Sequence, residues 1–193
     1  MVHLLSEFGL DIKKEALATD LSLYASHQNL KLTKYEEKKR NAIHNIYNSV
    51  IKTSASRVGF SRVNGLDSAT NNYEFQALYF ESFSKNFKAF SAAYQAISEA
   101  YDVLEQESIY IDSDLEEEVK TCLGTIQNTY NENHASLTQG HDAAKQFDKQ
   151  QLCLSSMPFD LNKFHDNCTR VWAVRTSDAR NKLKNTMREL LCI

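Results

Sequence analysis

One stretch of the chain carries a pattern that a long, packed helix satisfies. Apolar side chains, most of them aromatic, recur there at alternating spacings of three and four residues: Phe80, Phe83, Phe87, Phe90, Tyr94, Ile97, Tyr101 and Leu104. This spacing keeps them on one side of an α-helix. A stripe of small residues runs beside them: Ala89, Ala93, Ala96, Ala100 and Val103. A helix with two adjacent apolar stripes can pack against two neighbours, so we predict it at the centre of a bundle.

Glycine and proline are scarce, which argues against a sheet protein. The 193 residues include 5 Gly and 1 Pro, where average usage would give about 14 and about 10. Sheets need turns, and turns consume those two residues. The composition therefore predicts an all-α fold with long uninterrupted helices.

Helix starts and a second seam divide the chain. Three predicted helix starts each have a polar N-cap residue with Glu three positions later: Thr33 with Glu36, Asn71 with Glu74, and Ser113 with Glu116. A further seam of three- and four-residue spacings follows: Leu115, Val119, Cys122, Ile126, Thr129, Asn133, Leu137, Gly140, Ala144 and Phe147. We predict one helical domain over 1–193, an elongated antiparallel bundle of three long helices at 73–193. Shorter N-terminal helices occupy 1–54, and a loop occupies 55–72.

Charge and motifs exclude several classes of function. The net charge of −3 and the pI of about 6.1 disfavour a nucleic-acid binder. The charge is uneven, with eight basic and two acidic residues at 31–62, and two basic and twelve acidic residues at 63–118. No apolar run is long enough to span a membrane. No nucleophile, phosphate-loop or dinucleotide motif is present. His134 and His141 share a helix face, but we interpret them as ordinary surface histidines. We therefore expect no catalysis, no metal and no cofactor.

The four cysteines suggest two disulfides. If the last two helices fold back on each other, Cys122 lies opposite about residue 185, within two helical turns of Cys192. Cys153 lies in the intervening turn and reaches Cys168 if the turn folds back. We predict the pairs Cys122–Cys192 and Cys153–Cys168, which imply an oxidising compartment. Four buried free thiols in a reducing compartment remain the alternative. Asn167-Cys168-Thr169 is also a formal N-glycosylation sequon at Asn167.

The C-terminal part resembles a known family. Cys168-Thr169, followed by Arg188-Glu189-Leu190-Leu191-Cys192-Ile193 at the end of the chain, is similar to the end of the secreted insect helical domain typified by the tsetse EP protein. The resemblance covers about 70 residues from Cys122 onward. It implies helices joined by disulfides and secretion, and it implies no particular chemistry. We do not interpret Met1–Leu10 as a signal peptide, and a secreted protein whose signal has been removed would show the same start.

Two functions remain open on the sequence. The first is a secreted, non-enzymatic binding protein that engages a protein partner through exposed helix faces. The second is a carrier that holds a small apolar, lipid-like ligand between its helices. The residues that would line such a ligand site are Phe83, Phe87, Phe90, Tyr94, Ile97 and Tyr101.

Overall fold

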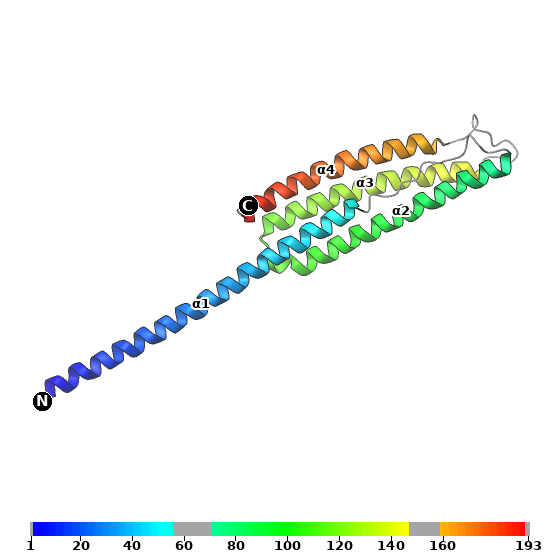
Figure 1. Ribbon diagram of the computed structural model, residues 1–193. Helices are drawn as coiled ribbons and strands as arrows, with labels where there is room; N and C mark the ends of the chain where they lie inside the picture. Colours follow the sequence, from blue (N-terminus) through cyan, green and yellow to red (C-terminus); the bar gives the residue numbers. More distant parts are fainter. Residues whose placement is uncertain (1, 56–70, 147–158, 192–193) are drawn as a thin grey trace. The chain divides into compact units, whose positions relative to one another are not determined.

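The computed structural model describes residues 2–55, 71–146 and 159–191, all of which lie in or beside helices. The elements are α1 (Val2–Ala55), α2 (Asn72–Glu107), the short 3₁₀ helix η2 (Ser108–Tyr110), α3 (Ser113–Gln146) and α4 (Leu161–Leu191) (Figure 1). These described residues form no strand. The prediction of an all-α helical bundle is confirmed.

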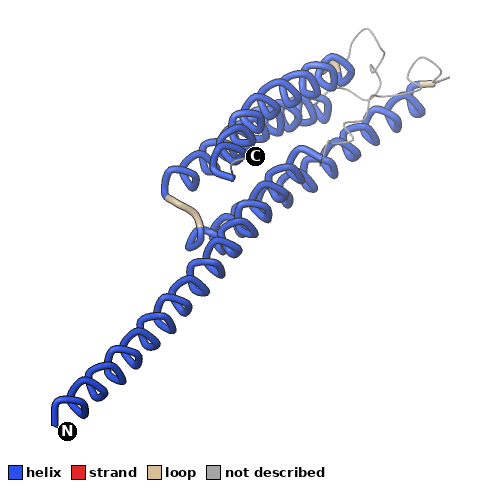
Figure 2. The backbone as a smooth tube through the Cα atoms, turned by 60° about the vertical axis from the view of Figure 1, so that its left-hand side comes forward, coloured by secondary structure: helices blue, strands red, loops and turns tan. Residues whose placement is uncertain are grey.

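The chain divides into two units, Met1–Asn41 and Ala42–Ile193, where the sequence predicted one domain. The first unit is the N-terminal part of α1. The second contains the last part of α1 together with α2, α3 and α4. Figure 2, coloured by secondary structure, shows that the described parts of both units are helical.

The N-terminal region differs from its prediction because α1 is one helix of 54 residues. The pair Thr33 and Glu36 does not start a helix. Thr33 lies inside α1, where its hydroxyl donates to the carbonyl of Asn29 at 2.8 Å. A threonine within a helix commonly makes this bond to the preceding turn. The sequence from 18 to 41 contains neither Gly nor Pro, so nothing in it interrupts the helix.

Helix starts elsewhere follow the polar residues before them. The Asn71 side chain accepts from the backbone N–H of Glu74 at 2.9 Å, as predicted. For α3 the cap is Asp112, one residue before the predicted Ser113, and it accepts from the N–H of Leu115. Asp160 caps α4 through the N–H of Lys163. The predicted loop at 55–72 falls mostly on 56–70, outside the described residues.

Within the second unit, α3 packs against both α2 and α4. The predicted α3–α4 register is confirmed, because Thr186 donates to Glu118 at 2.6 Å and Arg175 pairs with Glu132 further along. These pairs agree with the expectation that Cys122 lies opposite about residue 185. Near its end, α1 runs beside the C-terminal part of α2, where Asn45 donates to Glu107 at 2.7 Å.

Two clusters of buried side chains form the core of this unit. The aliphatic cluster joins all four helices: Ile43, Ile46, Val50, Ala93, Ile97, Ala100, Leu104, Leu115, Val119, Cys122, Leu123, Ile126, Trp172, Leu183 and Met187. The aromatic cluster joins α2, α3 and α4: Tyr79, Phe83, Phe90, Leu137, Ala144, Leu161, Phe164 and Cys168. The bundle therefore has four helices at the aliphatic cluster, where the sequence predicted three.

The seam predicted on α3 is buried, whereas the seam predicted on α2 is only partly buried. On α3 every described member is buried, from Leu115 to Ala144; Phe147 lies outside the described residues. On α2 the buried line instead runs through Phe83, Asn86, Phe90, Ala93, Ile97, Ala100 and Leu104. Tyr94 and Tyr101 are exposed, by 55% and 37%. The predicted α2 seam was thus rotated toward the tyrosines, whereas Ala93 and Ala100 are the side chains that are buried at these turns.

Candidate interaction surfaces

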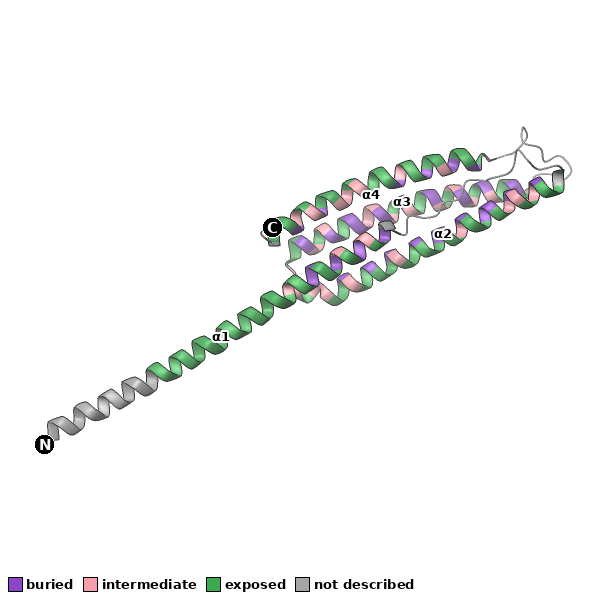
Figure 3. Cartoon of the chain, viewed as in Figure 1, coloured by how far each residue is buried: buried purple, intermediate pink, exposed green. Residues whose placement is uncertain are grey.

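A run of exposed apolar side chains distinguishes residues 18–41 of α1, here called the exposed segment. Six large apolar side chains in it are between 47% and 64% exposed: Leu21, Leu23, Tyr24, Leu30, Leu32 and Tyr35. Figure 3 shows the described residues of this part of α1 almost entirely in the colour for exposed residues. Scattered surface leucines are normal, but four of these six side chains lie along one side of the helix, namely Leu21, Tyr24, Leu32 and Tyr35, while Leu23 and Leu30 lie on the opposite side.

Four of these side chains repeat at intervals of eleven residues. Leu21 and Leu32 continue to Ile43, and Tyr24 and Tyr35 continue to Ile46. Eleven residues make slightly more than three full turns, so each series lies close to one line of the helix. Ile43 and Ile46 are 2% and 0% exposed. We call Leu21, Tyr24, Leu32 and Tyr35 the apolar stripe, since they lie on the line of the helix that the core residues Ile43 and Ile46 continue.

Sequence reasoning missed this stripe although the signal was present. The predicted helix start at Thr33 divided residues 1–54 into shorter helices, so that Leu21 and Leu32 fell on different predicted elements. The eleven-residue spacing that links Leu21, Leu32 and Ile43 would have indicated one continuous helix with one apolar line.

Basic residues accompany one half of the exposed segment. Lys31, Lys34 and Arg40 are exposed, and residues 31–40 together carry five basic and two acidic side chains, a net charge of +3. Between residues 18 and 26 the single charged side chain is Asp20. The two halves of the segment therefore differ in charge while sharing the stripe.

The six residues predicted to line an apolar ligand do not share one environment. Phe83, Phe90 and Ile97 are buried in the two core clusters. Phe87 is half-buried, and the two tyrosines of the set are exposed. The ring of Phe90 meets that of Tyr130 edge-on at 5.6 Å, so an aromatic side chain of α3 occupies this part of the seam. The ligand-lining role of these residues stays a prediction.

His134 and His141 belong to the aromatic face between α2 and α3. The ring of His141 contacts Phe83 at 5.1 Å and Phe87 at 5.4 Å, and that of His134 contacts Phe90 at 5.6 Å. These are edge-to-face or inclined contacts of packed rings. Over the part of the chain that the structure describes, no group of three or more His, Cys, Asp or Glu side chains could hold a metal ion.

Two pockets open at the four-helix end. The first, of about 240 Å³, lies between α1 and α4 and is lined by Ile43, His44, Tyr47, Lys184, Met187 and Arg188. The second, of about 560 Å³, lies between α1 and α2 and has a more polar lining that includes Asn45, Lys52 and Glu107. Neither of these two pockets includes a residue of the predicted ligand-lining set.

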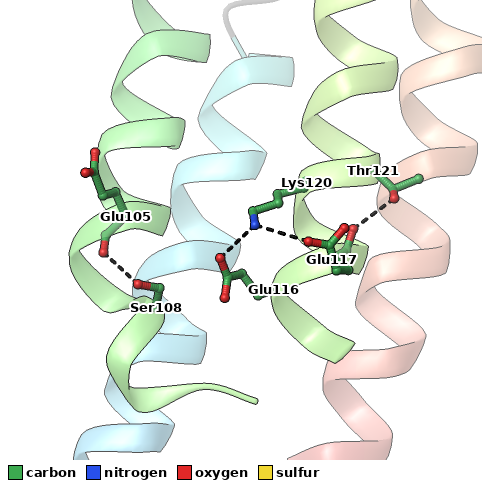
Figure 4. Close-up of polar contacts among 6 residues, drawn as sticks. All are labelled: Glu105, Ser108, Glu116, Glu117, Lys120 and Thr121. Carbon is green, nitrogen blue, oxygen red and sulfur yellow. Dashed lines mark hydrogen bonds and ion pairs between the residues drawn. The ribbon is translucent and has the colours of Figure 1, made fainter. Parts of the chain in front are cut away.

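Acidic side chains gather at the turn between α2 and α3 (Figure 4). Lys120 Nζ lies 2.8 Å from a carboxylate oxygen of Glu116 and 3.1 Å from one of Glu117. The hydrogen bond to Glu116 and then that to Glu117 raise the pKa of Lys120. Such pairs at a solvated helix surface contribute little to stability. Lys120 therefore neutralises part of the negative charge at this turn, and the charge that remains there is negative.

Two of the four cysteines lie among the described residues. Cys122 and Cys168 are buried free thiols, in the aliphatic and the aromatic cluster respectively. Burial raises the pKa of the Cys122 thiol to about 11, against a smaller lowering by Arg180, and that of Cys168 to about 12. Cys153 and Cys192 lie outside the described residues, so both pairings stay predictions.

The sequon residue Asn167 is exposed on α4, and its side-chain oxygen accepts from Arg170 at 3.2 Å. Its exposure leaves it accessible to solvent, and glycosylation there stays a prediction. Of the helices in the described ranges, none combines the length and the apolar character needed to cross a membrane.

Comparisons with protein-family models, with curated proteins and with solved structures found no match to this chain. The resemblance to the tsetse EP-protein domain therefore stays a prediction. Any statement about function depends on the surfaces described above.

Proposed function

We propose that this chain is a secreted, non-enzymatic binding protein that engages a protein partner through the apolar stripe of α1. One observation carries the proposal: the stripe side chains lie on the same line of the helix as the core residues Ile43 and Ile46, yet they are between 47% and 64% exposed. Burying one such side chain contributes roughly 1.5–3 kcal/mol. A partner that covers four of them would therefore gain substantial binding energy.

The secondary structure of the exposed segment supports the same function. Most helix stability in proteins comes from packing of an amphipathic face rather than from intrinsic propensity. A segment of two dozen residues whose apolar line is left in water lacks that contribution. A partner helix or groove laid along the line would supply it, which is the usual mode of helix recognition.

Secretion rests on the cysteines and on the family resemblance. If the predicted pairs form, the protein matures in an oxidising compartment. A non-reducing peptide map of protein from its natural source tests this part. Linked peptides containing Cys122 with Cys192 and Cys153 with Cys168 are expected, and four alkylatable thiols in the denatured, unreduced protein would contradict secretion with disulfides.

Site-specific photo-crosslinking tests the binding surface. A benzophenone amino acid is placed at Leu32 and, as a matched control, at Val174 on α4, which are 61% and 55% exposed. Each variant is irradiated with total protein from the natural source. We expect protein adducts from position 32 and none from position 174. Equal labelling at both positions, or none at position 32, would overturn the proposal.

The carrier of an apolar ligand along the aromatic seam is the second proposal. It ranks lower because three of its six lining residues are already covered by protein side chains. Native mass spectrometry of source-purified protein distinguishes it, since a bound lipid would add its mass to that of the chain.

A further inference from the structure

We infer that the partner of the apolar stripe is a second copy of this chain, paired antiparallel along that stripe and centred on Gln28. The inference rests on the proposed function and names its partner. It follows from the positions of the stripe residues and from the charge difference between the two halves of the segment.

The stripe is symmetric about Gln28. Leu21 and Tyr35 lie seven residues on either side of it, and Tyr24 and Leu32 lie four residues on either side. In an antiparallel pair centred there, Leu21 meets Tyr35 of the other copy and Tyr24 meets its Leu32. Each layer then combines one aromatic with one aliphatic side chain, so that large and smaller side chains alternate along the interface. Such alternation fills an interface evenly.

Gln28 would act as the register-setting residue. It is half-buried on the exposed segment, and in this pairing its amide meets the same amide of the other copy. An amide carries both donors and an acceptor, so two copies can hydrogen-bond to each other. One polar pair within an apolar helix interface selects a single register, because other registers bury it opposite an apolar side chain.

Charge selects the antiparallel orientation. A parallel pair would place the two basic stretches 31–40, each with a net charge of +3, beside each other. The antiparallel pair places residues 31–40 beside residues 16–25 of the other copy, where Asp20 is the one charged residue. Like charges across a helix interface disfavour the wrong partner orientation.

Cysteine cross-linking tests both the pairing and its orientation. Under mild oxidation, Gln28→Cys alone should form a disulfide-linked dimer. A mixture of Leu21→Cys and Tyr35→Cys chains, distinguished by a small mass tag on one of them, should form the mixed dimer. Leu21→Cys alone should remain uncross-linked. The unsubstituted chain under the same oxidation measures any background from the native cysteines.

Sedimentation measurements supply the independent readout. The full chain, of 22.1 kDa, should sediment at twice its mass, and the double variant Leu32→Ser/Tyr35→Ser should sediment as a monomer. The matched control Ile109→Ser/Val174→Ser also removes two exposed apolar side chains and should remain a dimer. Circular dichroism checks that the bundle of each variant stays folded.

The outcomes separate this inference from the proposed function. Efficient cross-linking of Leu21→Cys with itself would indicate a parallel pair and overturn the antiparallel arrangement. A monomer at every concentration, with photo-adducts from position 32 to a different protein, would overturn self-pairing while the proposed function stands. A monomer with no adduct at position 32 would overturn both.

Discussion

The two ends of the bundle are built from different side chains and a different number of described helices. At the aliphatic cluster, α1 adds Ile43, Ile46 and Val50 to the three helices of the hairpins, and small or branched side chains fill the centre. At the aromatic cluster, α2, α3 and α4 meet around Tyr79, Phe83 and Phe90. Among the described residues, fewer helices therefore meet at the cluster whose buried side chains are larger. The comparison teaches that the two clusters fill the space between their helices with side chains of different size, as close packing requires.

The largest effect should come from truncating a central side chain at either end. Phe83→Ala should lower the free energy of unfolding by about 3–5 kcal/mol and Ile46→Ala by about 2–5 kcal/mol, because each leaves a cavity at a fully packed position. Urea denaturation measures both. Val174→Ala, at an exposed position, should change stability by no more than about 0.5 kcal/mol. If Ile46→Ala behaved like this control, α1 would not belong to the core.

Gly140 and Gly124 on α3 give a matched test of how tightly α3 is packed at two positions. A methyl group on Gly140 would lie 2.6 Å from Cδ1 of Phe159 and close to two further ring atoms, whereas one on Gly124 would meet nothing within 4 Å. Gly140→Ala should therefore lower the free energy of unfolding by about 1–3 kcal/mol through overpacking. Gly124→Ala should raise it by up to about 1 kcal/mol through helix propensity.

A double variant isolates the cause of that difference. Adding Phe159→Ala to Gly140→Ala removes the ring that the new methyl group meets, so the two changes should cost less together than their sum. Additive costs would show that Phe159 is not the obstacle at Gly140.

Helix caps give a smaller effect at each end. Asp112 caps α3 next to the aliphatic cluster, and Asp160 caps α4 next to the aromatic cluster. Replacing either by Ala should lower the free energy of unfolding by about 0.5–2 kcal/mol, because a backbone N–H loses its acceptor. The matched Asp→Asn variants keep a side-chain oxygen at the cap and should retain most of the stability. Thermal unfolding of the four variants checks the prediction.

In the fully reduced protein, where Cys122 and Cys168 are free thiols in the two clusters, ionisation of these thiols should give the smallest effect on stability. Burial raises the pKa from 9.0 to about 11 for Cys122 and to about 12 for Cys168. A thiol with a raised folded-state pKa ionises more readily in the unfolded chain. It therefore stabilises the fold fully below pH 9, and this contribution is lost as the pH rises toward the folded-state values. Substituting either cysteine by Ser or Ala should flatten the fall of stability between pH 9 and pH 11.

Alkylation rates provide a second check on the same thiols. Because the thiolate is the reactive form, the native thiols should react at pH 8 about 100-fold more slowly at Cys122 and about 1,000-fold more slowly at Cys168 than in the unfolded chain. Rapid alkylation of either cysteine in the folded protein would contradict its burial.

The spacing of apolar residues predicted the buried face of a helix correctly where spacing alone decides which side chains are buried. On α3 every described member of the seam from Leu115 to Ala144 is buried, because an interface between helices accepts side chains of their polarity. On α2 the same rule favoured Tyr94 and Tyr101, whose hydroxyls prefer water, over the neighbouring alanines. A one-residue rotation of a helix changes which stripe faces its neighbours, and spacing cannot resolve so small a rotation.

The exposure of the candidate binding surface was harder to predict from the sequence. The eleven-residue spacing was present in the sequence, but a stripe of Leu and Tyr predicts burial rather than exposure. That Ile43 is covered while Leu21 and Leu32 are open to solvent depends on which other helices reach that part of α1. No local pattern contains that information.

The sequence by itself determined that this protein is helical, where α2 starts, and how α3 and α4 pair, because capping, glycine scarcity and heptad spacing act over a few residues along one chain. The tertiary structure decided that α1 is shared between a core and a solvent-exposed segment, and that alanines rather than tyrosines of α2 are buried in the core. The physical reason is that burial depends on neighbours distant in sequence, whereas helix formation depends on residues within one or two turns.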